Sequence, residues 1–194
     1  MRYVKDGFSA ALLIFALLTA WSAGAVADGG SKSGTAMQKL AESMLADIQQ
    51  TTWIKEGRGA HTVYIFFDPN CPYCHRLFLN TRTLVKEGKL ELRWIPVGML
   101  MTTSEGKAVA ILQAEDPLAA FYKNEEHYDK GGAIEEDLAS AEVEKQLKAN
   151  ESLLSRTRFG AVPVMLFRDK EGVARLVTGS PPRDRLVKIL SEVK

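Results

Sequence analysis

The cysteine content is the feature that most constrains this chain. Its 194 residues include only two cysteines, Cys71 and Cys74. Two cysteines cannot make the disulfide framework of a small secreted domain, nor a zinc site built from four cysteines. A disulfide between them would close a very short loop and stabilise the fold little. The chain must therefore fold around an ordinary hydrophobic core, and its Cys-x-x-Cys pair calls for a chemical explanation.

Charge and composition exclude two further classes of protein. The chain carries 25 basic and 24 acidic side chains, so its formal net charge is +1. This balance excludes a strongly basic nucleic-acid-binding protein, and we expect no nucleic-acid partner. Hydrophobic residues make up 46% and charged residues 25% of the chain, which excludes a wholly disordered protein.

The first 27 residues have the pattern of a secretory signal peptide. Arg2 and Lys5 precede the uncharged stretch 7–27, whose densest apolar part is 10–21 and which ends in a small-x-small pattern at Ala27. We expect cleavage after Ala27. An uncleaved membrane anchor is the alternative, because the stretch is just long enough to span a bilayer. Either outcome places the remaining chain on the oxidising side of the membrane.

A linker and a helix are expected before the main domain, which we place at residues 60–194. Residues 28–35 have the composition of a flexible linker. From residue 36 to about 53, apolar side chains recur at steps of three and four, which predicts an amphipathic helix. Its apolar stripe packs either on its own domain or on a partner, as a docking or dimer helix. Residues 28–59 are thus assigned to linker and helix.

A strand, a helix and a second strand are expected at the start of the main domain. Residues 61–67 are continuously apolar and rich in β-branched and aromatic types, as in a buried strand. A helix follows from Tyr73 to about Lys86, with Gly88 as its stop, and residues 90–97 form the next strand. This βαβ spacing predicts that the two strands are parallel neighbours.

The second half predicts a helical block and then a hairpin. Residues 104 to about 159 are helical in pattern, with a break at Asp116–Pro117 and a charged amphipathic segment from Glu135 to Lys148. After this block the sequence predicts a hairpin of strands 164–168 and 173–177 and a closing helix, 183–193. The fold class is therefore α/β: one mixed sheet in βαβ–ββα order with an inserted helical subdomain.

The two cysteines lie where the first strand gives way to its helix. With Cys71 at the N-cap and Pro72 at the first helical position, no backbone donor is lost. Cys71 then faces free amides and the positive end of the helix dipole, which lower the pKa of its thiol. Cys74, one turn further, should be more buried and less acidic. Cys71 is thus the expected nucleophile and Cys74 the resolving thiol, while Pro72, Tyr73 and His75 tune the thiolate.

Other interpretations of the same cysteines remain open at this point. Cys-x-x-Cys-His is also the attachment motif of c-type haem, which needs an axial ligand and a haem cavity. Cys71, Cys74 and His75 could hold a metal, although the other histidines, His61 and His127, are scattered. The cysteines could also be inert, but a helix N-terminus favours reactivity.

A proline begins the first hairpin strand. A cis Val162–Pro163 bond would leave the Val162 backbone free to pair with a substrate strand beside the cysteines. The alternative is an ordinary trans proline at a strand start, which is the commoner state. The Cys71–Cys74 pair is what favours the cis form.

These residues together resemble a known family. Residues 66–75 (FFDPNCPYCH), 94–98 (WIPVG), 107–117 (KAVAILQAEDP) and the proline loop 162–163 are similar to the DsbC/DsbG group of periplasmic thiol:disulfide isomerases. The similarity covers roughly residues 60–193. It implies a thioredoxin fold with an inserted helical domain, periplasmic localisation and thiol–disulfide exchange on proteins.

The resemblance also implies partners. The expected substrates are cysteine-containing exported proteins, and the expected redox partner is a DsbD-like or DsbB-like membrane protein. No cofactor and no metal are expected. Two other functions fit the same residues: a periplasmic reductase that protects single cysteines of exported proteins, and a non-catalytic copper chaperone that uses Cys71, Cys74 and His75.

Three features differ from the pattern of the group. Its members carry an N-terminal dimerisation domain, whereas only residues 28–59 precede the catalytic domain here, so we expect a monomer. Val162 stands where the isomerases typically have Thr and DsbA-type oxidases have Val. Ile65, six positions before Cys71, stands where thioredoxin and DsbA have a buried acid. Cys74 must therefore lose its proton to water or to another group.

Overall fold

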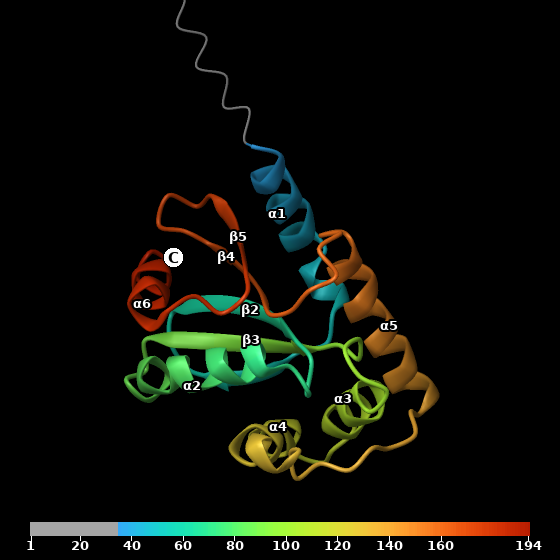
Figure 1. The fold of residues 1–194 in the computed structure, drawn as a ribbon. Coiled ribbons are helices and arrows are strands. Elements are labelled where there is room, and N and C mark those ends of the chain that lie inside the picture. Colours follow the sequence, from blue (N-terminus) through green and yellow to red (C-terminus); the bar gives the residue numbers. More distant parts are fainter. Residues whose placement is uncertain (1–34) are drawn as a thin grey trace, which may run out of the picture. The chain divides into compact units, whose positions relative to one another are not determined.

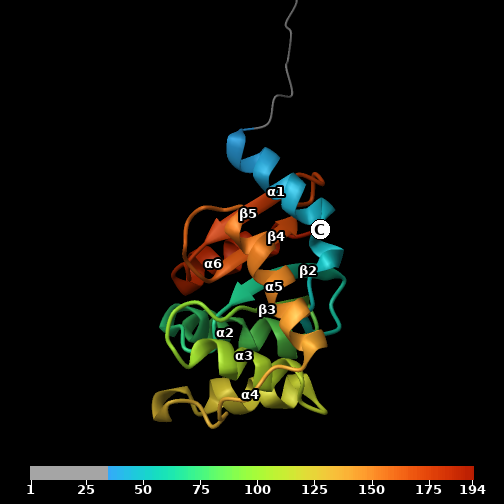
Figure 2. The ribbon, with the colours of Figure 1, turned by 90° about the vertical axis from the view of Figure 1, so that its right-hand side faces the viewer.

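A computed structural model describes residues 35–194, in which helices surround one mixed sheet (Figures 1 and 2). The expected signal peptide, residues 1–27, and most of the expected linker lie outside the described residues. The helices are α1 (Ala36–Ala46), α2 (Pro72–Lys86), α3 (Ser104–Leu112), α4 (Pro117–Glu126), α5 (Ala141–Ser155) and α6 (Arg183–Ser191), with short 3₁₀ turns at Ile48–Gln50 and Tyr128–Lys130. The strands are β1 (Ile54–Gly57), β2 (His61–Phe67), β3 (Leu90–Pro96), β4 (Val164–Arg168) and β5 (Ala174–Thr178).

The sheet order is β1-β3-β2-β4-β5, which places β2 at the centre. β2 runs parallel to β3, with His61 opposite Leu90 and Phe67 opposite Pro96, and antiparallel to β4. β4 and β5 form an antiparallel hairpin. The predicted βαβ unit, hairpin and closing helix are therefore confirmed. Gly88 follows the end of α2, as predicted for a helix stop. Its φ of +67° lies in the left-handed region that favours glycine.

The segment before β2 differs from the prediction of linker and helix over residues 28–59. α1 ends at Ala46 instead of continuing to about residue 53, and β1 then pairs antiparallel with β3 at the sheet edge. The sequence does not predict β1 because this strand is short and half of its residues are charged, with Lys55 beside Glu56. Its register places the Glu56 carboxylate inside the protein, where it is 1% exposed.

The helical block also differs in detail from the prediction. The break at Asp116–Pro117 is confirmed, since Asp116 caps α4 and accepts a hydrogen bond from the amide of Ala119. The charged segment predicted from Glu135 is not helical until Ala141, where the Ser140 side chain caps α5. The chain before this cap runs across α3 instead, and the Asp137 amide donates to the Gly106 carbonyl.

The apolar stripe of α1 packs on its own domain. Ala41 and Met44 of α1 and Ile48 of the 3₁₀ turn after it are buried, and α1 lies against β5 and β4 (Figure 1). An ion pair reinforces this placement, because Arg168 of β4 donates to both carboxylate oxygens of Glu42. None of the helices in the described part of the chain is long and apolar enough to cross a membrane.

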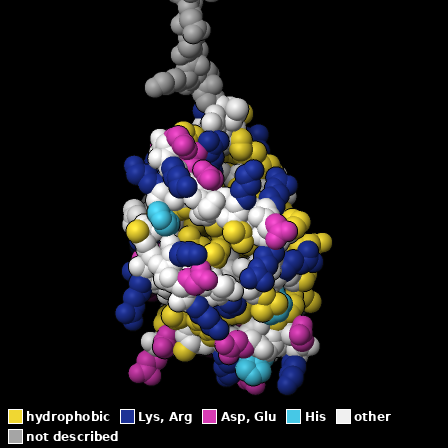
Figure 3. All heavy atoms as spheres, turned by 90° about the vertical axis from the view of Figure 1, so that its left-hand side faces the viewer, with side chains coloured by type: hydrophobic (Ala, Val, Ile, Leu, Met, Phe, Trp, Pro, Cys, Tyr) yellow, Lys and Arg dark blue, Asp and Glu magenta, His cyan; other side chains and the backbone are white. Residues whose placement is uncertain are grey.

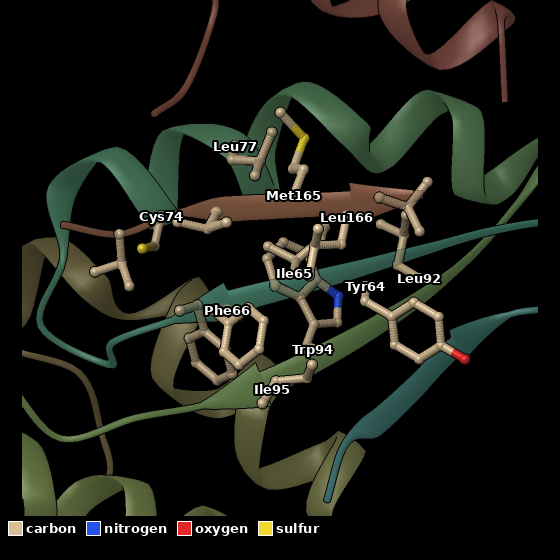
Figure 4. Close-up of a cluster of buried hydrophobic side chains, with 14 of the residues drawn as sticks. Tyr64, Ile65, Phe66, Cys74, Leu77, Leu92, Trp94, Ile95, Met165 and Leu166 are labelled. Atoms are coloured by element: carbon tan, nitrogen blue, oxygen red, sulfur yellow. The ribbon is translucent and has the colours of Figure 1, made fainter. Parts of the chain in front are cut away.

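Two hydrophobic clusters support the helices. The main cluster joins α2 to the sheet, and Figure 4 shows Leu77 and Cys74 on the side of α2 that faces the strands, with Met165, Ile65 and Trp94 nearby. A smaller cluster fixes α3 to α5. Its members are Ala108, Val109, Val143 and Leu147. The helical block thus has its own contacts and is held as a unit beside the sheet.

Glu56 generates a stability prediction. Its carboxylate accepts hydrogen bonds from Arg82, Tyr122 and the Trp94 indole, whose Nε1 lies 2.8 Å from Oε2. Glu56→Gln should lower the free energy of unfolding by about 3 kcal/mol, because it leaves the charge of Arg82 without its partner inside the protein. Urea denaturation measures this. Glu144→Gln breaks an exposed ion pair with Lys148 and should leave the midpoint unchanged; equal effects of the two substitutions would contradict the prediction.

Candidate active site

Cys71 is the N-cap of α2, and Pro72 is the first helical residue. The Cys71 backbone is extended, with φ −85° and ψ 115°, which turns its side chain back over the first turn. There Sγ accepts a hydrogen bond from the Cys74 amide at 3.3 Å. Both cysteines are free thiols. The strand-to-helix connection therefore aims a sulfur, instead of the usual oxygen, at the free amides of the helix.

The environments of the two thiols are opposite in effect. The hydrogen bond from the Cys74 thiol, together with those from the backbone amides of Cys74 and Tyr73, lowers the pKa of Cys71 to about 7, against burial and the Asp68 carboxylate. Burial raises the pKa of Cys74 well above its ordinary value, and the hydrogen bond to Cys71 adds to this. At neutral pH the shared proton thus resides on Cys74 while Cys71 carries much of the negative charge.

Both cysteines are almost fully buried. Cys71 is 2% exposed and Cys74 is 1% exposed. The expected order, with Cys74 the more buried, holds, but the difference in exposed fraction is small. The distinction lies in what surrounds each sulfur: hydrogen bonds dominate at Cys71, and loss of solvent dominates at Cys74.

The proline loop faces the first cysteine. The Val162–Pro163 peptide bond is cis, and the Val162 carbonyl oxygen lies 3.6 Å from Cys71 Sγ. The Pro163 carbonyl accepts a hydrogen bond from the Gly179 amide at 2.8 Å, which ties the loop to the end of β5. The structure thus brings the cysteine pair Cys71 and Cys74 next to Val162 and Pro163, although the two pairs are about ninety residues apart in the chain.

The side chains of Tyr73 and His75 point in different directions. Tyr73 is 53% exposed, and the Arg76 guanidinium lies 5.0 Å from its ring centroid. His75 turns inward, where Nδ1 lies 3.0 Å from Glu125 Oε2. Its ring also stacks on Tyr128, with centroids 4.4 Å apart. Tyr73 is therefore placed at the surface beside Cys71, and His75 connects the motif to the helical block.

A polar network under the motif was not predicted from the sequence. Asp68, fully buried, accepts hydrogen bonds from the amides of Met99 and Leu100 and from the Ser104 hydroxyl. Asn70 donates to Ser104, and its side-chain oxygen accepts a hydrogen bond from the Lys107 ammonium at 2.9 Å. The start of α3 therefore fixes the loop that delivers Cys71.

The helical block adds two more residues that sequence reasoning missed. Tyr128 donates its hydroxyl hydrogen to the Asn70 carbonyl at 2.8 Å. Glu125, at the end of α4, is 2% exposed, and its burial raises the pKa of its carboxyl group to about 7. No spacing in the sequence links residues 125–128 to a motif fifty positions earlier. The one available signal for Glu125 was the presence of a glutamate in α4, a helix that otherwise packs on the hydrophobic core.

The remaining histidines do not join this site. His127 Nδ1 lies 3.0 Å from the Lys123 carbonyl. His61 lines a groove of about 340 Å³ between α2 and α6, with Leu84, Leu90 and Val187. Figure 3 shows the side of the molecule on which α6 lies, where Lys and Arg surround a central hydrophobic patch. Within residues 35–194, no group of three His, Cys, Asp or Glu side chains could hold a metal ion.

Comparisons with known proteins agree with this geometry. The model of the thioredoxin-like domain family matches residues 48–194. The DsbG thiol:disulfide interchange protein of Pseudomonas aeruginosa is 35% identical over 153 residues, which are 78% of this chain and 60% of that protein. Its Escherichia coli namesake is 29% identical over 168 residues, 81% of this chain and 66% of the relative. The chain thus spans less than two thirds of the length of these relatives.

A solved structure shares the fold. The catalytic domain of Proteus mirabilis ScsC superposes with a TM-score of 0.58 at 16% identity, covering 78% of this chain and 97% of that one. The expected thioredoxin fold is confirmed, with a five-stranded mixed sheet.

The acidity of Cys71 is directly testable. Ultraviolet absorbance of the thiolate, followed from about pH 5 to about pH 10, should show one transition near pH 7 in the reduced protein, because the first turn of α2 stabilises that thiolate. Cys71→Ser should remove this transition. A single transition at the ordinary value for cysteine, about 8.5, would contradict the geometry.

Proposed function

Because this chain belongs to the thioredoxin-like family, we propose that it is a thiol:disulfide oxidoreductase and isomerase that acts on protein disulfides through Cys71 and Cys74. The observation that carries the proposal is the placement of Cys71 Sγ at the free amides of α2, 3.6 Å from the Val162 carbonyl. A thiolate in this position is a nucleophile, and a second thiol one turn away can displace whatever the first one binds.

The first step is attack by Cys71. Its thiolate adds to one sulfur of a substrate disulfide, the substrate S–S bond breaks, and the released sulfur leaves as a thiolate that takes a proton from solvent. The product is a mixed disulfide between Cys71 and the substrate. The lowered pKa of Cys71 supports this role, since it keeps a large fraction of the thiol ionised at neutral pH.

The second step depends on direction. In reduction, Cys74 attacks Cys71 Sγ, forms the Cys71–Cys74 disulfide and releases the second substrate thiolate. In oxidation the same steps run backwards, and in isomerisation a different substrate thiol attacks the mixed disulfide and regenerates Cys71. The hydrogen bonds on the Cys71 thiolate stabilise the reduced protein. They therefore favour transfer of the disulfide to substrates, an oxidising or isomerising role.

The surface around the dithiol supports polypeptide substrates. Large apolar side chains that belong to the motif, to the loop held by Asp68 and to the segment before Val162 are between 40% and 60% exposed. They are Tyr73, Met99, Leu100, Met101 and Phe159. A hollow of about 450 Å³ that includes Tyr73, Val162 and Thr178 runs beside the proline loop. Exposed apolar surface of this kind binds unfolded segments, and the Val162 backbone would pair with them.

The cellular setting is part of the proposal. The signal-peptide pattern of residues 1–27 supports export to the periplasm, where disulfides form and persist. The substrates would then be cysteine-containing exported proteins. Each net oxidation or reduction of a substrate leaves the dithiol in the opposite redox state, so a membrane redox partner of the DsbD or DsbB type would restore it. The exchange chemistry itself uses the two cysteines and requires no cofactor.

The roles of the two cysteines are tested by paired substitutions. Cys71→Ser should abolish reduction of insulin and rescue of scrambled ribonuclease, because no other thiolate faces the substrate. Cys74→Ser should leave the first step intact and accumulate a mixed disulfide with the substrate, since the resolving thiol is gone. Non-reducing electrophoresis and mass spectrometry detect this adduct.

The matched control is Ser155→Cys, which restores a second cysteine in the Cys71→Ser protein at an exposed position. That protein should remain inactive. Turnover by Cys71→Ser at the wild-type rate, or an adduct formed by Cys74 in its place, would overturn the assignment.

A further inference from the structure

One buried acid beside the dithiol has no part in the steps described so far. Glu125 is the penultimate residue of α4, two positions before His127, and is 2% exposed. Its Oε2 lies 3.0 Å from His75 Nδ1, and its Oε1 accepts a hydrogen bond from Asn124 Nδ2 at 3.1 Å. Asn124 also donates to the Pro69 carbonyl. The carboxyl group is thus held at a fixed place against the active-site motif.

The resolving step needs a proton acceptor. Cys74 must ionise before its sulfur can attack the mixed disulfide, yet burial raises its pKa well above the ordinary value. Ile65, on the central strand, supplies no acid or base, and it is 1% exposed. A buried thiol with a high pKa loses its proton efficiently only to a base positioned close by.

Glu125 interacts electrostatically with both thiols. A negative charge on Glu125 raises the pKa of Cys74, and the Cys71 thiolate raises the pKa of Glu125. The other titratable groups that face this carboxyl are His75 of α2, Tyr128 and, through the thiols, Asp68. Each of these negative charges disfavours the others, so the ionisation of Glu125 is coupled to that of the thiols.

From this geometry we propose that Glu125 accepts the proton of Cys74 during resolution of the mixed disulfide, with His75 as the group that passes the proton on to solvent. The inference rests on the proposed exchange function and extends it to a residue of the helical block. Burial is the main cause of the raised pKa of Glu125, and the hydrogen bond with His75 opposes it; the Cys71 thiolate adds a smaller repulsion. In the mixed disulfide Cys71 carries no charge, so this repulsion is absent and a larger fraction of Glu125 is ionised at the moment when Cys74 must react.

The proposed step balances in protons and electrons. The Cys74 S–H bond breaks and its proton moves to the Glu125 carboxylate, while the Cys74 sulfur forms a bond with Cys71 Sγ. The bond between Cys71 and the substrate sulfur breaks, and the substrate leaves as a thiolate. The protein dithiol is oxidised by two electrons and the substrate disulfide is reduced by two. Protonated Glu125 is left beside the new disulfide.

His75 is placed to return that proton to water. Its side chain is 15% exposed, against 2% for Glu125. The Nδ1–Oε2 hydrogen bond survives in either state, because Nδ1 donates to an ionised carboxylate and accepts from a protonated one. Stacking on Tyr128 holds the ring in this orientation. His75 thus acts as a positioning and relay residue between the buried acid and the surface.

The experiment isolates the resolving step. The reduced full chain is mixed with the aromatic disulfide DTNB, which releases one coloured thiol when Cys71 reacts and a second when Cys74 resolves the adduct. Stopped-flow absorbance gives the rate of each phase from about pH 5.5 to about pH 9.5. Wild type, Glu125→Gln and the control Glu151→Gln are compared. Glu151 is a half-buried acid that accepts a hydrogen bond from the Gly98 amide and does not contact the thiols.

The expected result is specific to the second phase. In wild type its rate should rise with ionisation of Glu125 and then level off. In Glu125→Gln it should be at least about a hundredfold slower near neutral pH, the low end of the effect of a positioned base, and should rise with hydroxide until it meets the wild-type rate. That convergence at high pH also demonstrates an intact fold. Glu151→Gln should follow wild type throughout.

Two results would overturn the proposal. One is a second phase in Glu125→Gln that matches wild type within twofold at every pH. The other is a loss of equal size at every pH, which would mean that Glu125 only supports the structure. Failure of the proposed function itself looks different: wild type would then show the first phase without the second.

Discussion

The free amides at the first turn of α2 are the constraint on which the rest of the site depends. They need an acceptor, and the chain supplies the Cys71 sulfur, with Pro72 occupying a position where no amide is required. The other features of the site either position this first turn of α2 or contact the sulfur that caps it. The central strand β2 delivers it, the proline loop covers it, and Cys74 stands one turn behind it as the second thiol. The lowered pKa of the Cys71 thiol is a consequence of ordinary helix capping.

The helical block does more than cover the sheet. Its first helix binds Asp68 and Asn70, which fixes the loop before Cys71, and its second helix places Glu125 against His75. The block therefore acts on both ends of the motif, through a hydrogen-bond network before the first cysteine and through an ionisable pair after the second. This arrangement explains how a chain with Ile65 on the central strand can still hold an acid near its dithiol.

The sequence predicted what depends on local pattern. Periodicity and turn residues located β2 to β5, α2 and α6, and capping rules placed Cys71 at the N-terminus of α2. The failures that concern buried acids are of one kind. β1 was missed because Glu56 looks solvated until its partners from α2, β3 and α4 are known. The same holds for Glu125, since only tertiary contacts distinguish a buried glutamate from a surface one. Residues whose role depends on distant partners leave no periodic signal.

The reduction potential of the Cys71–Cys74 disulfide tests the central claim most directly. Equilibration of the purified chain with glutathione buffers, followed by quantification of the dithiol, gives this value. A stabilised Cys71 thiolate favours the reduced protein and so predicts a potential between about −180 mV, the value for protein disulfide isomerase, and about −120 mV, the value for DsbA. A potential at or below about −270 mV, the value for thioredoxin, would mean that the helix does not stabilise the thiolate enough and would contradict an oxidising or isomerising role.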